Sequence, residues 1–465
     1  MPSVTRSALT YLVAGALFME YLDGTVIATA LPQMANSFGE RPAALGIGMS
    51  AYLLTVAVLI PASSFVADRF GAQRVFTAAI GLFTLASMAC GLTWSLPSFI
   101  AARVLQGMAG ALMVPVGRLV VVRNTPKTEL MAAIAALTWP ALVAPVAGPP
   151  VGGFITEYAS WRWIFFLNVP VGLIALPLAW KLTPDIRGAE RPPFDIAGFV
   201  LNGLALAAFL YAVDGLGQPG ASLGWPLAVL AGSIVAGFLA VRHAMRTPVP
   251  LVSLAAFRVR SFAATMLGGG LSRIGLSAMP FLLPLLFQVG MGRSAAASGL
   301  LILWFGIGNM VTKAVTTPIL RRLGFRSVLV ANQGLAVLST AGFAFVTPAT
   351  PLAVLVPLLL VAGFTRSLQF TAINTLAFAE VPQTLTSAAN VLNSASFQVS
   401  VGLGIALGAL LLRVADDGIG VPHGMPAFRV GFALLAVFSL LPLLDYAGLA
   451  RDAGALVSGR AARTG

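Results

Sequence analysis

Fourteen apolar runs, each about as long as a membrane-spanning helix, divide this sequence from end to end. A helix needs about 20 mostly apolar residues to cross the hydrocarbon core of a bilayer. In lipid, every backbone polar group must be bonded within the protein, and helices achieve this within a single segment. The sequence therefore predicts an all-α membrane protein with fourteen transmembrane helices, at residues 9–31, 44–66, 75–94, 97–121, 131–156, 161–180, 195–214, 225–241, 262–288, 295–318, 326–346, 351–377, 386–412 and 427–446.

The charge content excludes an ordinary soluble fold and argues against nucleic acid as a partner. Only 9% of the 465 residues are charged, whereas a soluble domain carries about 25%. The net charge is +13, but no basic patch alternates with aromatic residues as it would on a nucleic-acid surface. Basic residues of membrane proteins gather in cytoplasmic loops instead. The lipid bilayer is therefore the expected partner.

The distribution of lysine and arginine between the predicted loops sets the orientation. An even number of spans puts both termini on one side of the membrane. If that side is the cytoplasm, eighteen basic residues fall in the inner loops and termini and five in the outer loops. This bias predicts two cytoplasmic termini. The first apolar run continues to about Leu31 without a small-residue cleavage site, so it is interpreted as a span and not as a cleavable signal peptide.

The two halves of the chain match each other at a nearly constant offset. The loop at 67–75 matches 320–328 at offset 253, and further residues align at offset 256: Gly107 with Gly363, Pro126 with Pro382, and Ala132 with Ala388. This pattern predicts parallel repeats that enclose a site with alternating access. The expected organisation is two six-helix bundles plus two inserted central helices. The bundles are residues 1–190 and 251–465, the latter with a short cytoplasmic tail, and the insertion is 191–250.

Five motifs give the sequence a family resemblance. They are LDGTVIATALP at 22–32, SFVADRFGAQR at 64–74, RVLQGMAGA at 103–111, APVAGPPVGG at 144–153 and SWRWIFFLNVPVG at 160–172. Together they resemble the fourteen-span drug:proton antiporter branch of the major facilitator superfamily, typified by EmrB and QacA, and PVGR at 115–118 is most similar to its MdtD-like subgroup. Ser64 stands where the second motif usually has glycine, and Ala72-Gln73 replaces a basic pair. The resemblance implies the major facilitator fold and a place in the bacterial inner membrane.

Two acids and one arginine within predicted spans are the candidates for proton coupling. Glu20 and Asp23 are three residues apart and share a helix face. Asp23 and Arg103 lie at compatible depths in the first and fourth spans, so an ion pair, direct or water-bridged, is expected. Protonation of the acid would weaken that pair, and the resemblance assigns proton coupling to this region. A static structural pair is the alternative interpretation.

Two further motifs are expected to serve conformational change. A short cytoplasmic turn contains Asp68, Arg69, Gly71 and Arg74, and its glycine permits tight geometry. The resemblance implies a gate latch there, and an ordinary basic loop is the alternative. The resemblance also associates antiport with the fifth span, where small residues allow close helix approach and prolines bend the helix; a purely structural role is the alternative for these residues, Gly148, Pro149, Pro150, Gly152 and Gly153.

Positive charge in the second half predicts part of a substrate site. Arg273 and Arg366 lie near the middles of their spans, and acidic residues are scarce in the same half. Such arginines favour an anionic or zwitterionic substrate, although carbonyls or waters are alternative partners. Lys313 and Arg118 lie closer to cytoplasmic ends and are interpreted as snorkelling. The predicted substrate-binding set is completed by the polar span residues Gln369, Asn374 and Asn390.

The predicted function is proton-coupled export of small molecules, of the multidrug-efflux type. An exporter or exchanger of organic anions such as carboxylates is the alternative that the two arginines favour. The retained intramembrane charges argue against a sensor or scaffold. No histidine lies at membrane depth and no HExxH, GxSxG or P-loop motif occurs, so we expect no enzyme activity, no metal and no cofactor. The expected ligands are a small-molecule substrate and protons; the oligomeric state stays open, and a monomer is compatible with the sequence.

Overall fold

The computed structural model describes residues 3–126, 129–185, 187, 193–216, 224–248, 250–382, 385–415 and 424–450. Helices dominate these residues, and no β-strand occurs among them. The predicted all-α class is therefore confirmed. The predicted boundary at residues 190 and 191 and the tail from residue 451 lie outside the described residues.

Each predicted span coincides with one helix or with consecutive helices. The first six spans correspond to α1 (Ser3–Val26) with η1 (Ile27–Thr29) and α2 (Leu31–Phe38), then η2 (Pro42–Leu45), α3 (Gly46–Phe70), α4 (Ala72–Gly91), α5 (Leu96–Asn124), α6 (Leu130–Tyr158), α7 (Trp163–Phe166) and α8 (Asn168–Leu182). The predicted insertion is α9 (Ile196–Leu216) and α10 (Gly224–Arg246). The remaining elements are η3 (Leu254–Arg258), α11 (Arg260–Leu285), η4 (Leu286–Gly290), α12 (Ala295–Leu323), α13 (Phe325–Phe343), α14 (Leu352–Ala379), α15 (Thr386–Arg413), α16 (Met425–Phe438) and α17 (Leu441–Ala447).

Twelve spans in the described residues are long and apolar enough to cross a membrane. The chain is thus a multi-pass membrane protein. The two predicted spans outside this set are α6 and α13. Helix α13 carries Asn332 and Gln333 near its middle, which lowers its apolar content. The full count of fourteen therefore stays a prediction.

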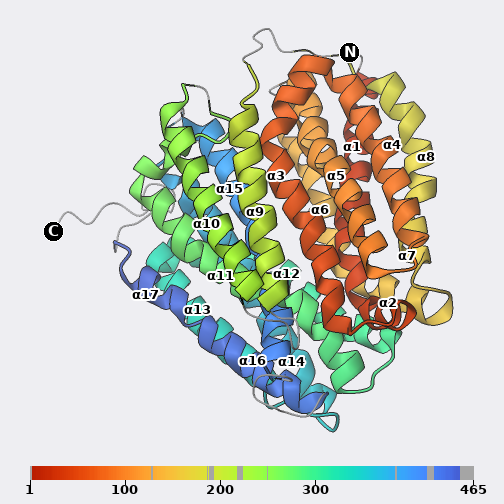
Figure 1. Ribbon diagram of the computed structural model, residues 1–465, viewed down its shortest axis with the longest axis vertical. Helices are drawn as coiled ribbons and strands as arrows, with labels where there is room; N and C mark the ends of the chain where they lie inside the picture. The colour runs from red at the N-terminus through yellow and green to blue at the C-terminus, as the bar shows by residue number, and fades with distance from the viewer. Residues whose placement is uncertain are drawn as a thin grey trace. The chain divides into compact units, whose positions relative to one another are not determined.

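The contacts between residues divide the chain into two compact units. The first comprises residues 1–203 and 294–300, and the second comprises 204–293 and 301–465. In the first unit α1 packs against α5, α6 and α8, and α4 packs against α5 and α8 (Figure 1). In the second unit α11 packs against α14, α15 and α17, and α13 packs against α14 and α16. Each unit is thus a helix bundle with its own apolar core.

The helix boundaries repeat at the offsets found in the sequence. Helices α4, α5 and α6 begin at residues 72, 96 and 130, and α13, α14 and α15 begin 253, 256 and 256 residues later. The paired glycines Gly71 and Gly324 have φ values of 92° and 78°, and each separates two consecutive helices. Glycine adopts such positive φ angles without steric penalty. The repeat is therefore structural as well as sequential.

The helices of the predicted insertion, α9 and α10, have largely exposed apolar surfaces. Only 17% of the most apolar window of each is buried, against 56% for α5. Ile234 and Phe238 are each 64% exposed. Exposed apolar side chains in this number are expected of helices that contact lipid.

Candidate functional site

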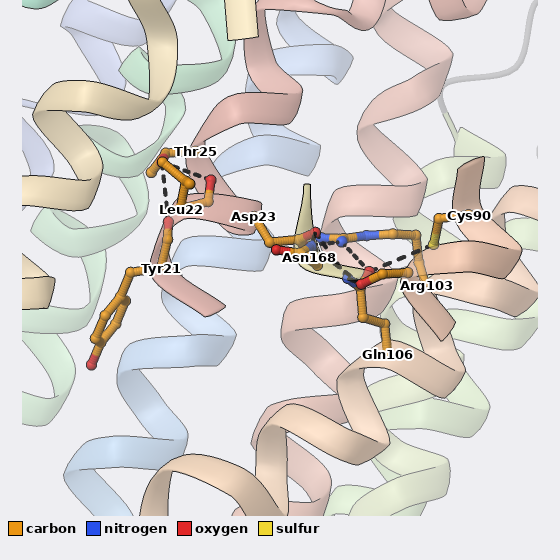
Figure 2. Close-up of polar contacts among 9 residues, drawn as sticks. Tyr21, Leu22, Asp23, Thr25, Cys90, Arg103, Gln106 and Asn168 are labelled. Atoms are coloured by element: carbon orange, nitrogen blue, oxygen red, sulfur yellow. Dashed lines mark hydrogen bonds and ion pairs between the residues drawn. The ribbon is translucent and has the colours of Figure 1, made fainter. Parts of the chain in front are cut away.

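A buried ion pair lies inside the first unit (Figure 2). Arg103 Nη1, on α5, lies 2.7 Å from Asp23 Oδ2, on α1, and both side chains are 1% exposed. The ion pair expected from the sequence is therefore present. Two charges this deeply buried are stable only when further hydrogen bonds satisfy their remaining polar atoms.

Amide and hydroxyl side chains supply those bonds around Asp23. Gln106 Nε2 and Asn168 Nδ2 donate to Asp23 Oδ1 over 2.9 and 2.8 Å. Both amides also donate to Ser87 Oγ, over 2.8 and 3.2 Å, and Gln106 Oε1 accepts from Arg103 Nη1 over 2.5 Å. The carboxylate thus accepts three hydrogen bonds, and the network connects α1, α4, α5 and α8 at one point.

A second acid, Glu20, joins the network through Tyr52. The Tyr52 hydroxyl donates to the Glu20 carboxylate. The Tyr52 ring also lies 4.3 Å from Arg103 Cζ, the distance of a cation–π contact. A Cβ at Gly110 would lie only 3.2 Å from Glu20 Cδ, so this glycine permits the close packing of α5 on α1. Glu20 Oε2 is buried and has no hydrogen-bond partner among the described residues.

The glycines of the predicted antiporter motif bring α6 against α1 beside Asp23. A Cβ at Gly148 would overlap Thr25 Oγ1, and a Cβ at Gly152 would overlap the Val26 carbonyl. Small residues at this spacing allow two helices to approach closely. Thr25 Oγ1 also donates to the Ala144 carbonyl over 3.2 Å. The motif therefore fixes the helix that carries the buried acids.

The other side of the same motif contacts the first turn of α12. A Cβ at Gly153 would overlap the Ala295 carbonyl, and a Cβ at Gly299 would overlap the carbonyl of Pro149. Helix α6 runs unbroken through Pro149 and Pro150. Beyond the motif, Glu157 Oε2 accepts from the Ala296 amide over 2.7 Å. The motif thus packs against both α1 and α12. Each of these contacts is possible only because a glycine has no side chain.

The turn between α3 and α4 contains the predicted gating residues. Gly71 combines a φ of 92° with close packing, because a Cβ there would overlap Asp185 Oδ1. Asp68 Oδ1 lies 3.6 Å from Arg123 Nη1 at the end of α5, with side chains 30% and 41% exposed. The two predicted arginines of the turn, Arg69 and Arg74, are both exposed. The structure thus brings Asp68 to α5 and Gly71 to the segment after α8.

Arg273 lies in a polar network of the second unit. The residue is fully buried, and its Nη2 donates to Asn374 Oδ1 and Asn393 Oδ1 over 2.7 and 2.8 Å. Its Nε and Nη1 are buried without hydrogen-bond partners in the part of the chain that is described. The structure therefore brings Arg273 together with the predicted Asn374 and with Asn393, another polar residue that the sequence places in the thirteenth span.

The other predicted substrate-binding residues are placed differently. Arg366 is half-buried, with its Cζ 4.8 Å from the centroid of the Phe370 ring. Gln369 is fully buried and accepts from Asn332 Nδ2 over 2.8 Å, which connects α14 to α13. Asn390 is exposed, one helical turn before Asn393, and is not a hydrogen-bond partner of Arg273. Gln369 thus bonds to a neighbouring helix and not to Arg273.

Several functional candidates in these networks were absent from the sequence-based set. Gln106 and Asn168 lie inside the quoted motifs RVLQGMAGA and SWRWIFFLNVPVG, and an amide within an apolar run was the available signal. Tyr52 and Ser87 had no comparable signal. Within the described residues, no group of three or more histidine, cysteine, aspartate or glutamate side chains is placed to hold a metal ion.

Known proteins resemble this chain over nearly its whole length. A family profile described as "Major Facilitator Superfamily" matches residues 13–405. The MdtD protein of Salmonella dublin, provisionally named a multidrug resistance protein, is 38% identical over 464 residues, covering 97% of this chain and 96% of its own. The MdtD protein of Serratia proteamaculans, which has the same provisional name, is 38% identical over 452 residues, covering 95% and 93%.

Solved transporter structures share the fold. The POT family transporter PepTSo superposes with a TM-score of 0.69 at 13% sequence identity, covering 96% of this chain and 97% of its own. An autoinhibited POT family peptide transporter gives a TM-score of 0.67 at 16% identity, covering 98% of both chains. At these identities the similarity concerns the fold alone.

Proposed function

The chain belongs to the major facilitator superfamily, as its motifs predicted, and from this premise we propose that it is a proton-coupled secondary transporter that exports small molecules. The provisional name of the MdtD relatives, multidrug resistance protein, supports efflux of the multidrug type. Transporters built from two repeats move their substrate by alternating access. A monomer with a small molecule and protons as its ligands is sufficient for this activity.

The observation that carries the proton-coupling proposal is the buried network around Asp23. A protonated Asp23 would lose its negative charge, and one of its oxygens would become a donor. At least one of its three accepted hydrogen bonds, from Arg103, Gln106 and Asn168, would then have to change. Because these bonds connect α1, α5 and α8, and the same amides also bond to Ser87 on α4, proton binding would be linked to the packing of those helices.

Glu20 extends this proposal to a second acid. It lies one helical turn before Asp23, and Tyr52 contacts both Glu20 and Arg103. A proton on either acid would change the charge that Arg103 experiences, because all four groups lie in one low-dielectric cluster. We therefore assign proton coupling to Glu20, Asp23 and Arg103 as a unit.

The remaining motifs are proposed to control the conformational change. The basic loops support cytoplasmic termini in a bacterial inner membrane, and in that orientation the turn with Asp68, Arg69, Gly71 and Arg74 would face the cytoplasm as a gate. The tight contacts of α6 at Gly148, Gly152 and Gly153 support a role in transmitting movement of α1. The proposed organisation remains two bundles, 1–190 and 251–465, with 191–250 inserted.

Transport in inverted membrane vesicles tests this function. An imposed proton gradient should drive accumulation of small molecules from a panel of lipophilic cations and organic anions. A protonophore, or vesicles from cells without the protein, should abolish it. The absence of gradient-dependent accumulation for every compound would refute proton-coupled export.

A further inference from the structure

We propose that the second unit binds the anionic group of an organic substrate on the face of α14 that presents Thr371 and Asn374. This inference rests on the proposed export function and names its substrate class, organic anions with an apolar body such as aromatic carboxylates. Neither the family match nor the names of the relatives assign such a site.

A broad, open cavity lies on this face of α14. It has a volume of about 410 Å³ and is lined by Thr371, Asn374, Thr375, Phe378 and Ala379. Small-molecule sites typically occupy about 300–1,000 Å³. The lining residues follow a spacing of three and four, so they share one side of the helix. The cavity has a polar end, with Thr371 and Asn374, and an apolar end, with Phe378 and Ala379.

The Asn374 side chain is held so that its donor group remains for the cavity. Its Oδ1 accepts from Arg273 Nη2 over 2.7 Å and from Asn393 Nδ2 over 3.3 Å. An amide side chain has one acceptor oxygen and an NH2 group with two donors. Because Arg273 takes the oxygen, the NH2 group is what Asn374 can offer a ligand.

A second cation, Lys313, occupies the acceptor oxygen of Thr371 in the same way. Lys313 Nζ donates to Thr371 Oγ1 over 2.9 Å. An ammonium group can only donate, so the threonine oxygen accepts and its own proton remains available. Thr375 differs, because its hydroxyl already donates to the Thr371 carbonyl over 2.8 Å. The polar end of the cavity thus offers two donors, on Asn374 and Thr371. Each of these side chains accepts a hydrogen bond from a cation, Arg273 or Lys313.

No acid among the described residues of the second unit is paired with these charges. In the described residues no carboxylate lies within 4.0 Å of Arg273, Arg366 or Lys313. Arg273 Nε and Nη1 and Arg366 Nε are buried without hydrogen-bond partners there. A buried cation without a counter-ion is strongly unfavourable. A bound anion would supply the missing charge.

The internal repeat makes this asymmetry informative. Helices α1 and α5, which carry Asp23 and Arg103, correspond to α11 and α14, which carry Arg273 and Arg366. At offset 256 Arg366 corresponds to Gly110, the residue packed against Glu20. Equivalent helices thus carry acids in one half and only cations in the other, which suits protons in the first and an anion in the second.

Matched probes and matched variants test the site. 4-Phenylbutyrate and 4-phenylbutylamine have the same apolar body and opposite charge. Binding to the purified full-length protein, measured by calorimetry in a neutral detergent, should favour the carboxylate. Thr371→Val removes a hydroxyl that has a proton to donate and should weaken carboxylate binding about tenfold or more, the usual effect of losing a hydrogen bond to a charged group. Thr375→Val, equally isosteric and in the same cavity, should retain it.

A second variant distinguishes loss of binding from loss of folding. Asn374→Asp keeps an acceptor for Arg273 but turns a carboxylate oxygen toward the cavity. It should abolish binding of 4-phenylbutyrate while the melting temperature and the gel-filtration profile stay native. Preference for the amine, or equal losses in Thr371→Val and Thr375→Val, would overturn the anion site.

Transport of the same probes in inverted vesicles separates this inference from the proposed function. Gradient-driven accumulation of the amine but not of the carboxylate would leave proton-coupled export standing and overturn the anion site. Carboxylate binding with the expected variant pattern, together with no gradient-driven accumulation of any compound in the panel, would support the site and overturn proton-coupled export.

Discussion

Replacing Asp23 with asparagine would leave Arg103 as a buried cation without its counter-ion. In the native network Asp23 Oδ2 accepts from Arg103, and Oδ1 accepts from Gln106 and Asn168. An asparagine has one oxygen and one NH2 group in place of the two oxygens. Whichever way its amide is turned, the NH2 group faces a donor. The substitution therefore removes a charge and also creates at least one unsatisfied contact.

The magnitude follows from the burial of the pair, whose side chains are each 1% exposed. Removal of one partner from a buried ion pair lowers stability by about 3–5 kcal/mol. The matched control is Asp68→Asn, because the Asp68–Arg123 pair is separated by 3.6 Å and its side chains are 30% and 41% exposed. Loss of an exposed pair changes stability by about 1 kcal/mol or less. Asp23→Asn combined with Arg103→Gln removes both charges and should recover most of the loss.

Two measurements test this reasoning. The first is unfolding of the purified variants in detergent, which reports the loss and its recovery in the double variant. The second is uphill export in vesicles across a range of pH, which Asp23→Asn and the double variant should both lack. An Asp23→Asn protein as stable as Asp68→Asn would contradict the buried-charge argument. Normal pH-dependent export by Asp23→Asn would remove Asp23 from the proton pathway.

Two further predictions concern glycines. Gly152→Val should separate α6 from α1, because its side chain would overlap the Val26 carbonyl, and should lower the unfolding free energy by about 1–3 kcal/mol. Gly15→Ala on α1 meets no atom within 4 Å and should stabilise the protein by about 0.5–1 kcal/mol in the same unfolding assay, so an equal loss in both would refute the packing argument. Gly39→Ala has open space around it and an αL backbone with φ 71° and ψ 29°, so it should lose about 1–2 kcal/mol. Gly71→Ala should lose more, because its φ of 92° and ψ of 133° lie outside the αL region and its Cβ would overlap Asp185; an equal loss in both variants would refute this argument.

Much of the fold could be predicted because the bilayer restricts the choices. Apolar runs of span length have few alternatives to helices, so every predicted span coincides with one helix or with consecutive helices. The internal repeat was also detectable in the sequence, since Gly71 and Gly324 mark the same turn in both halves. Helix breaks were harder, because the sixth span divides between Phe166 and Asn168 without a signal in its hydropathy.

The candidate site was predictable only in part. Asp23 and Arg103 were detectable because charges inside apolar runs are rare, and their similar depths suggested a pair. Amide and tyrosine side chains occur in spans for many reasons. The sequence therefore could not predict that Gln106, Asn168 and Tyr52 belong to the network. Gln369 was selected by residue type alone, and its bond to Asn332 on a neighbouring helix could not be predicted from the sequence.

The division between sequence and tertiary structure has a physical basis. Hydropathy and charge placement act one segment at a time, so the order of the apolar residues was enough to predict the helical membrane fold. The repeat and the family followed from short motifs, which are also local in the sequence. Hydrogen bonds act over about 3 Å and join residues such as Asp23 and Asn168, which are 145 positions apart. Their pairing depends on how each helix is rotated and packed. That rotation determined which cations in the second unit bond to residues of the α14 cavity and which polar side chains bond to neighbouring helices.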